Sequence, residues 1–135
     1  MKTLRFWMPP TLWAVVIFLF STLPTVKTFE FYWWDFTIKK SAHIIEYGIF
    51  SLLLYRAFIN TGVDRKKAAI YSILISVLYG LTDEYHQGFT PGREPKLRDV
   101  GFDTIGAILA IYSIWNLLPK MPKKLKSWAK SWRLI

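Results

Sequence analysis

Four long apolar runs constrain this chain more than any other feature of its sequence. Residues 6–24, 41–59, 68–88 and 100–118 carry few charges, and each run reaches the roughly 20 residues that a helix needs to cross a bilayer. Backbone groups inside lipid must be hydrogen-bonded within the protein, so these runs predict helices. The expected fold is therefore all-α, a single membrane domain over residues 1–135 built as an integral membrane four-helix bundle.

Composition excludes several other classes of protein. Hydrophobic residues make up 53% of the 135 residues and aromatic residues 18%, which is too apolar for a disordered chain. The chain has no cysteine, which excludes a disulfide scaffold, thiolate metal sites and cysteine catalysis. A cleaved signal peptide is the competing interpretation of residues 6–24, but Ser21-Thr22-Leu23-Pro24 offers no good cleavage site.

The basic residues predict the orientation of the bundle. The chain has 18 Lys and Arg against 9 Asp and Glu, for a net charge of +9. Twelve of the 18 lie at the amino terminus, near the turn around residues 56–67 and in the tail 119–135, together with one acid, Asp64. The positive-inside rule places both termini in the cytoplasm, with outer loops at about 24–41 and 88–99.

The basic excess is thus first a signal of topology, and we do not expect nucleic acid as a partner. The expected partner is the lipid bilayer. Trp128 and Trp132 can help the basic tail to dock on anionic lipid, and Arg56 is expected to extend its charge to the cytoplasmic interface.

Polar residues gather at the outer ends of the second, third and fourth runs. Spacings of three and four residues place them on one face of each helix: His43, Glu46 and Tyr47; then Tyr79, Asp83 and Gln87; then Asp99 and Asp103. Small residues follow the same helices in steps of four: Ser72, Ser76 and Gly80, then Gly106 and Ala110. These stripes predict one outward-facing polar pocket between the second, third and fourth helices, capped by residues 89–95.

Several chemistries fit such a pocket. Glu46, Asp83 and Asp99 can bind a divalent metal through oxygen ligands, although no cofactor is identified by the spacing. Lys40, Arg93 and Arg98 can instead bind a phosphate. His43, with Glu46 or Asp83, can act as a general base. The structural alternative is that these charges pair with one another and fix the register of the bundle.

The same residues resemble the VanZ-like family of bacterial membrane proteins. The resemblance rests on three blocks between Lys40 and Gly106: Lys40-x-x-His43-x-x-Glu46-Tyr47, Asp83-Glu84-x-x-Gln87-x-Phe89-x-Pro91-Gly92-Arg93 and Asp99-x-x-x-Asp103-x-x-Gly106. Two positions depart from the family pattern, which usually has Asp where this chain has Lys39 and Asn where it has Asp103.

The resemblance implies a multi-pass protein of the bacterial plasma membrane, associated with glycopeptide (teicoplanin-type) resistance and the cell envelope. The predicted function is recognition of an anionic lipid or a cell-wall precursor by its headgroup. Candidate catalytic residues, if the protein is an enzyme, are His43, Glu46 and Asp83; candidate binding residues are Lys40, Tyr47, Glu84, Gln87, Arg93, Arg98, Asp99 and Asp103.

Two alternatives remain open. One is a non-catalytic accessory factor that alters the access of glycopeptides through packing or partners. The other is a small proton-coupled transporter, which the clustering of charges at one side of the membrane disfavours. The sequence determines neither the reaction nor the oligomeric state.

Overall fold

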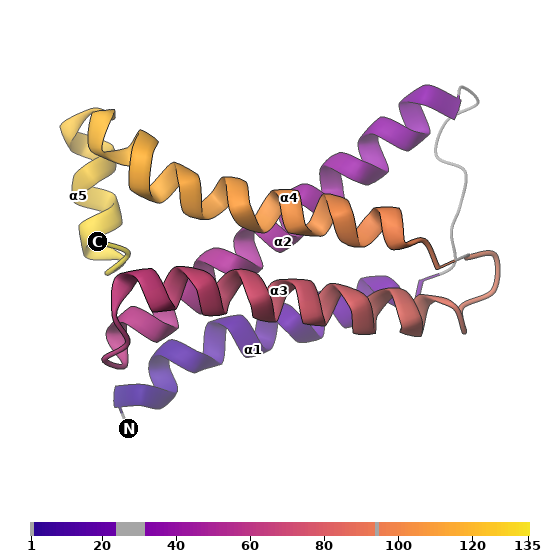
Figure 1. Cartoon of the computed structure of the whole chain (residues 1–135), viewed down its shortest axis with the longest axis horizontal. Coiled ribbons are helices and arrows are strands. Elements are labelled where there is room, and N and C mark those ends of the chain that lie inside the picture. The colour runs from indigo at the N-terminus through magenta and orange to yellow at the C-terminus, as the bar shows by residue number, and fades with distance from the viewer. Residues whose placement is uncertain (1, 24–31, 94) are drawn as a thin grey trace.

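A computed structural model describes residues 2–23, 32–93 and 95–135, and this part of the chain is helical with no strand (Figure 1). The helices are α1 (Lys2–Ser21), α2 (Tyr32–Asn60), α3 (Arg65–Gln87), α4 (Leu97–Tyr112) and α5 (Lys123–Ser131). A π-helical turn, η1 (Ser113–Leu117), and a 3-10 turn, η2 (Leu118–Lys120), continue α4 toward α5. The all-α prediction is therefore confirmed for the described residues.

Three of these helices are long and apolar enough to cross a membrane: Thr3–Ser21, Tyr32–Asn60 and Leu97–Lys120. Together they indicate a membrane protein. The third expected span coincides with α3, which has 23 residues but ends in a polar segment. Its buried polar side chains at that end are Asp83, Glu84 and Gln87. The four-span arrangement and the orientation of the termini remain predictions.

The second helix begins earlier than predicted. Its expected start was residue 41, with a loop over 24–41, but α2 begins at Tyr32, so the loop prediction is wrong for residues 32–41. Lys39 donates to Asp35 at 2.7 Å across one helical turn, and the Thr37 hydroxyl donates to the Trp33 carbonyl at 2.8 Å. Local pairing of this kind supports a helix where the charges lower the hydropathy. The rest of the predicted loop, residues 24–31, lies outside the described residues.

Small residues bring α2, α3 and α4 into close contact, as the stripes predicted. Ser72 and Ser76 on α3 are fully buried, and Gly106 on α4 lies against the backbone of Ile44 on α2. Gly48 on α2 also lies against the backbone of α4 at Gly106: a Cβ at position 48 would be 3.3 Å from the Gly106 carbonyl oxygen. This close crossing sets the depth at which the polar residues of α2 and α4 meet.

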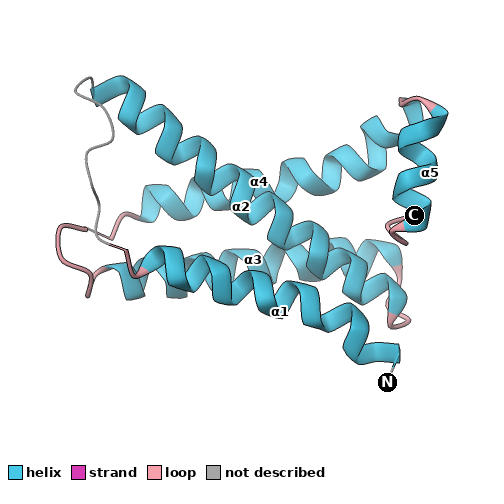
Figure 2. Ribbon diagram, turned by 180° about the vertical axis from the view of Figure 1, so that it is seen from behind, coloured by secondary structure: helices cyan, strands magenta, loops and turns pink. Residues whose placement is uncertain are grey.

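Two long-range hydrogen bonds attach α1 to this core. The Trp13 indole donates to the Glu46 carbonyl oxygen at 2.9 Å, and the Tyr79 hydroxyl donates to the Ala14 carbonyl oxygen at 2.6 Å. Ile17, one turn further along, is buried in the same apolar cluster as Phe50. The carboxyl end of α1 reaches the polar end of α3, where the Ser21 hydroxyl lies 3.0 Å from His86 Nδ1, whereas the first turns of α2 diverge from α1 (Figure 2).

The tail folds back onto the opposite end of the bundle. Arg56 donates through Nε to the Trp132 carbonyl oxygen at 2.6 Å, and Asn60 donates to the Arg133 carbonyl oxygen at 2.9 Å. Arg56 also lies over the ring of Phe6, with its guanidinium carbon 5.2 Å from the centroid. The side chain expected to extend to the interface therefore binds the carboxyl-terminal segment as well.

Candidate functional site

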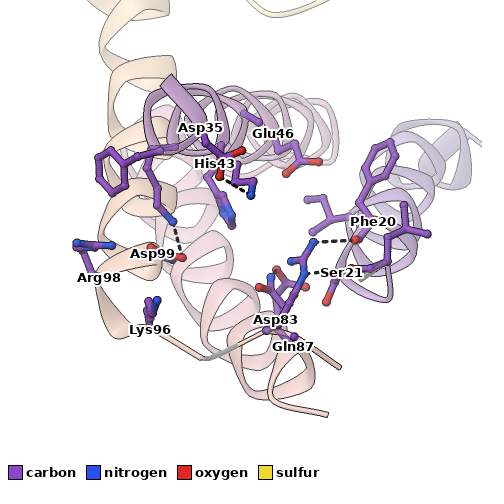
Figure 3. A pocket seen from close by; sticks show the side chains of 18 of the residues that line it. Phe20, Ser21, Asp35, His43, Glu46, Asp83, Gln87, Lys96, Arg98 and Asp99 are labelled. Atoms are coloured by element: carbon purple, nitrogen blue, oxygen red, sulfur yellow. Dashed lines mark hydrogen bonds and ion pairs between the residues drawn. The ribbon is translucent and has the colours of Figure 1, made fainter. Parts of the chain in front are cut away.

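A pocket of about 640 Å³ opens between the ends of the first four helices (Figure 3). The sequence predicted walls from the second, third and fourth helices, but α1 contributes a fourth wall through Ile17, Phe20 and Ser21. Eight of the predicted site residues line it: Lys40, His43, Glu46, Asp83, Gln87, Arg93, Arg98 and Asp99. The fold therefore gathers residues from three separate segments of the sequence into one cavity.

A histidine and an aspartate join α2 to α4 beside this pocket. His43 Nδ1 lies 2.9 Å from Oδ1 of Asp103, and the Asp103 side chain has no exposed surface. When the ring is neutral and Nδ1 donates to the carboxylate, the proton is fixed on Nδ1 and Nε2 is an acceptor. His43 itself lines the pocket, so the pair places an oriented imidazole at the pocket wall.

A second pair between the same helices involves Lys40. Its ammonium group lies 2.6 Å from Oδ2 of Asp99, with both side chains largely buried. The same ammonium lies 5.8 Å from the ring centroid of Phe36 and 5.9 Å from that of Phe102. Asp99 Oδ1 is buried and has no hydrogen-bond partner among the described residues. This pair leaves a carboxylate oxygen available to a donor from the pocket.

On α3, the carboxylate of Asp83 accepts a hydrogen bond from the Gln87 side-chain amide at 2.8 Å. Its other oxygen, Oδ1, is buried without a partner in the described part of the chain. Asp83 and Gln87 lie together in Figure 3, and Glu46 lies apart from them on α2. The pocket is thus bordered by carboxylates on two sides.

The loop after α3 closes the pocket against α1. Gly92 has a φ of +79°, and the Arg93 N–H donates to the Thr90 carbonyl oxygen at 3.1 Å, so residues 90–93 form a tight turn. The Arg93 guanidinium donates to the Leu23 carbonyl oxygen at 3.1 Å and to the Phe20 carbonyl oxygen at 3.3 Å. Arg93 therefore ties the capping loop to the carboxyl end of α1.

Three of the predicted binding residues lie behind the pocket lining. Tyr47 and Asp103 are fully buried, and both lie close to Gly80: a Cβ there would be 3.5 Å from the Tyr47 ring and 3.1 Å from Asp103 Oδ2. The Tyr47 hydroxyl and Asp103 Oδ2 have no partner among the described residues. Glu84 accepts a hydrogen bond from the Lys96 backbone at 2.7 Å and so supports the start of α4.

Sequence reasoning missed part of the lining. Tyr32, Asp35, Phe36 and Lys39 belong to the stretch expected to be a loop, and Lys96 belongs to the next loop. The Asp35-x-x-x-Lys39 spacing was a usable signal, because opposite charges four residues apart favour a helix. His86, at the end of α3, contacts α1, where its Nδ1 lies 3.0 Å from the Ser21 hydroxyl.

The described residues do not assemble a metal site. Within them, no group of three or more His, Asp or Glu side chains lies close enough to share an ion. The predicted ligands Glu46, Asp83 and Asp99 line one pocket but come from three different helices. The proposals below therefore use no metal.

The chain was compared with protein-family models, with curated proteins and with solved structures. The model described as VanZ/LLP1 matches residues 6–118, most of the chain. The chain belongs to the VanZ/LLP1 family. All eleven predicted site residues fall within the matched range, whereas α5 of this VanZ/LLP1 protein lies beyond it. Searches of the curated proteins and of the solved structures gave no match.

Proposed function

We propose that this VanZ/LLP1 protein uses the polar pocket to bind the headgroup of an anionic lipid or cell-wall precursor at the outer face of the bacterial plasma membrane. The supporting observation is that one cavity of about 640 Å³ combines several cations, several carboxylates and an oriented histidine. Small-ligand sites are commonly of this size and contain a few convergent polar groups.

The proposed topology has four spans, with both termini in the cytoplasm. The twelve basic residues at the amino terminus, the 56–67 region and the tail support this orientation. Figure 1 draws the amino terminus and α5 at one end of the bundle and the loop before α4 at the other. The pocket then opens at the outer surface, where cell-wall precursors and glycopeptides are found.

Arg98 is the cation best arranged to meet an incoming anion. Its side chain is exposed at the pocket edge, and its guanidinium carbon lies 5.0 Å from the centroid of Phe36. A cation–π contact of this kind holds the guanidinium beside the ring while its N–H groups remain able to form bidentate bonds with phosphate. Arg93 directs two N–H groups to carbonyls of α1, and its remaining donors can reach the same anion.

Membership of the VanZ/LLP1 family supports the proposed link to glycopeptide resistance and the cell envelope. A protein that binds a precursor headgroup alters what a glycopeptide meets at the surface. Two roles are compatible with this binding: sequestration alone, or a chemical change to the bound headgroup.

The His43–Asp103 pair favours the second role as an alternative function. With Nδ1 donating to the buried carboxylate, Nε2 can accept a proton from a water or hydroxyl that attacks the headgroup. The carboxylate stabilises the imidazolium that results, and the proton is then available to the leaving group. In this scheme His43 is the catalytic base and Asp103 a positioning residue.

Binding is tested with the purified protein in detergent, by native mass spectrometry with phosphatidylglycerol and with an undecaprenyl-phosphate lipid. Arg98→Gln is expected to weaken binding about ten-fold, since it removes a charge-assisted contact. Lys124→Gln, which removes one charge from exposed α5, serves as the control. Equal binding by both variants and the wild type would remove the basis for the headgroup pocket.

Catalysis is tested separately, by following the bound lipid or precursor over time with wild type and His43→Gln. Conversion by the wild type and its loss in His43→Gln, with binding retained, supports the enzyme. Binding without any conversion, together with full resistance in cells carrying His43→Gln, supports the accessory factor instead.

A further inference from the structure

A second cavity, of about 620 Å³, lies at the end of the bundle opposite the polar pocket. It is bordered by the first turn of α3, by the π-helical and 3-10 turns that follow α4, and by α5. Figure 1 shows α5 beside the end of the α4 segment, with the start of α3 at the same end of the molecule. We call this cavity the basic groove.

Three cations line the basic groove: Arg65 and Lys66 from α3 and Lys126 from α5. The lining side chains include no acid, and none of the three cations forms an ion pair within the described residues. The neighbouring acid, Asp64, caps α3 by accepting the backbone N–H of Lys66 at 3.0 Å. Lys126 donates to the Pro119 carbonyl oxygen at 3.3 Å, which holds its ammonium group at the groove. The groove therefore presents three positive charges with no acidic side chain between them.

Apolar and hydrogen-bonding groups line the rest of the groove. Ile114 and Leu118 provide aliphatic surface, and Trp115 is 41% exposed. The Trp115 indole donates to the Tyr55 hydroxyl at 3.2 Å, which leaves the hydroxyl hydrogen of Tyr55 for an acceptor in the groove. Adjacent cationic and apolar surfaces match a molecule with a phosphate at one end and a hydrocarbon chain at the other.

We propose that the basic groove binds one anionic phospholipid of the adjacent leaflet. The lipid phosphate lies among Arg65, Lys66 and Lys126, and an acyl chain runs over Ile114 and Trp115. Basic pockets between membrane helices commonly bind such headgroups, and each cation near the surface adds to the affinity. The apolar side of the groove favours a lipid over free phosphate. Arg56 and Asn60 hold the tail against α2, which keeps α5 next to the groove. A lipid bound there would contact α3, the turns after α4 and α5 at the same time.

The test uses the full chain in detergent and native mass spectrometry with phosphatidylglycerol and phosphatidylcholine of identical acyl chains. The groove variant is Arg65→Gln/Lys66→Gln/Lys126→Gln. Its matched control is Lys67→Gln/Lys123→Gln/Lys124→Gln, which removes the same charge from exposed residues that do not line the groove. Thermal unfolding of each variant verifies that it is folded.

In the Arg98→Gln background, where the polar pocket is weakened, we expect the chain to prefer phosphatidylglycerol about ten-fold or more, the added groove substitutions to abolish that preference, and the added control substitutions to keep it. Loss of the same size in the control would mean diffuse attraction to the tail and would overturn the proposal. Displacement of the lipid by excess inorganic phosphate would overturn it too, in favour of a free-anion site. Arg98→Gln separates this site from the polar pocket, because binding in the groove should persist in that variant.

Discussion

Gly106 on α4 lies so close to the carbonyl oxygen of Ile44 on α2 that a methyl group at position 106 has no room. The neighbour is backbone, which cannot move aside as a flexible side chain can. Ile44 directly follows His43 and Gly106 lies one turn after Asp103, so the spacing of the two helices here also sets the distance between those side chains.

Gly106→Ala is therefore expected to lower the free energy of unfolding by about 1–3 kcal/mol or more, because α2 and α4 must separate to admit the new methyl group. Gly101→Ala is the matched control: it lies on the same helix, and apart from the adjoining backbone of that helix nothing lies within 4 Å of the added Cβ. Thermal denaturation in detergent measures both. Equal losses of stability would show that the contact at position 106 does not determine the helix spacing.

At Asp103, replacement by asparagine and by alanine should have different effects. The asparagine side chain keeps an oxygen that can accept the His43 N–H, and it removes a buried charge, so Asp103→Asn should fold as well as the wild type. Asp103→Ala leaves His43 without that partner and should cost about 1–3 kcal/mol. Chemical denaturation compares the two variants, and equal stabilities would show that the hydrogen bond to His43 contributes little.

The same pair distinguishes the roles of the pocket. If His43 is a base, Asp103→Asn should slow conversion of the bound headgroup while leaving its affinity unchanged, because the carboxylate stabilises the imidazolium. A protein that only binds should be insensitive to this change in both measurements.

The attachment of α1 can be weakened without changing its apolar face. Tyr79→Phe removes the hydrogen bond to Ala14 and should cost about 0.5–1.5 kcal/mol. Hydrogen exchange of the α1 amides should then rise, with α2 and α4 little affected. Tyr112→Phe is the control, since its ring is exposed on α4. Uniform exchange changes across all helices would contradict a local role for Tyr79.

Release of the tail is expected from Arg56→Met, which keeps an unbranched side chain as far as the ε position but removes the N–H donor to the Trp132 carbonyl oxygen. Chymotrypsin should then cleave at Trp128 or Trp132 several-fold faster. Lys67→Met removes a charge at the same end of the bundle without removing a hydrogen bond to the tail. Equal cleavage rates in the two variants would argue against anchoring by Arg56.

The sequence predicted well those features that depend on local pattern. Small residues in steps of four anticipated the buried Ser72 and Ser76 and the close approach of Gly106, since such spacing places residues on one helix face. Helical spacing placed His43, Glu46 and Asp83 at one depth, and all three line the same cavity, while their role as a functional site stays a prediction.

The sequence pattern could not predict which side chains on different helices would contact one another. The partners His43 and Asp103 are separated by 60 residues, and periodicity indicates the face but not the partner. The bonds from Arg93 to α1 depend on where the chain packs α1, which no motif encodes. The early start of α2 was hidden because Asp35, Lys39 and Lys40 reduce the hydropathy that marks a span.

The π-helical turn at Ser113–Leu117 lies between α4 and the tail, so the helix faces before and after it are set independently. Each residue of an α-helix rotates the chain by about 100° around the helix axis. A π-helical turn takes more residues, so the side chains after it point in directions shifted relative to those before it. The face of α4 that meets α2 at Gly106 therefore does not dictate which side chains of the Ser113–Leu117 turn reach Tyr55. A deletion of one residue within the turn would rotate the tail while leaving the Ile44 contact in place, so evolution can alter one end of this membrane protein without disturbing the other.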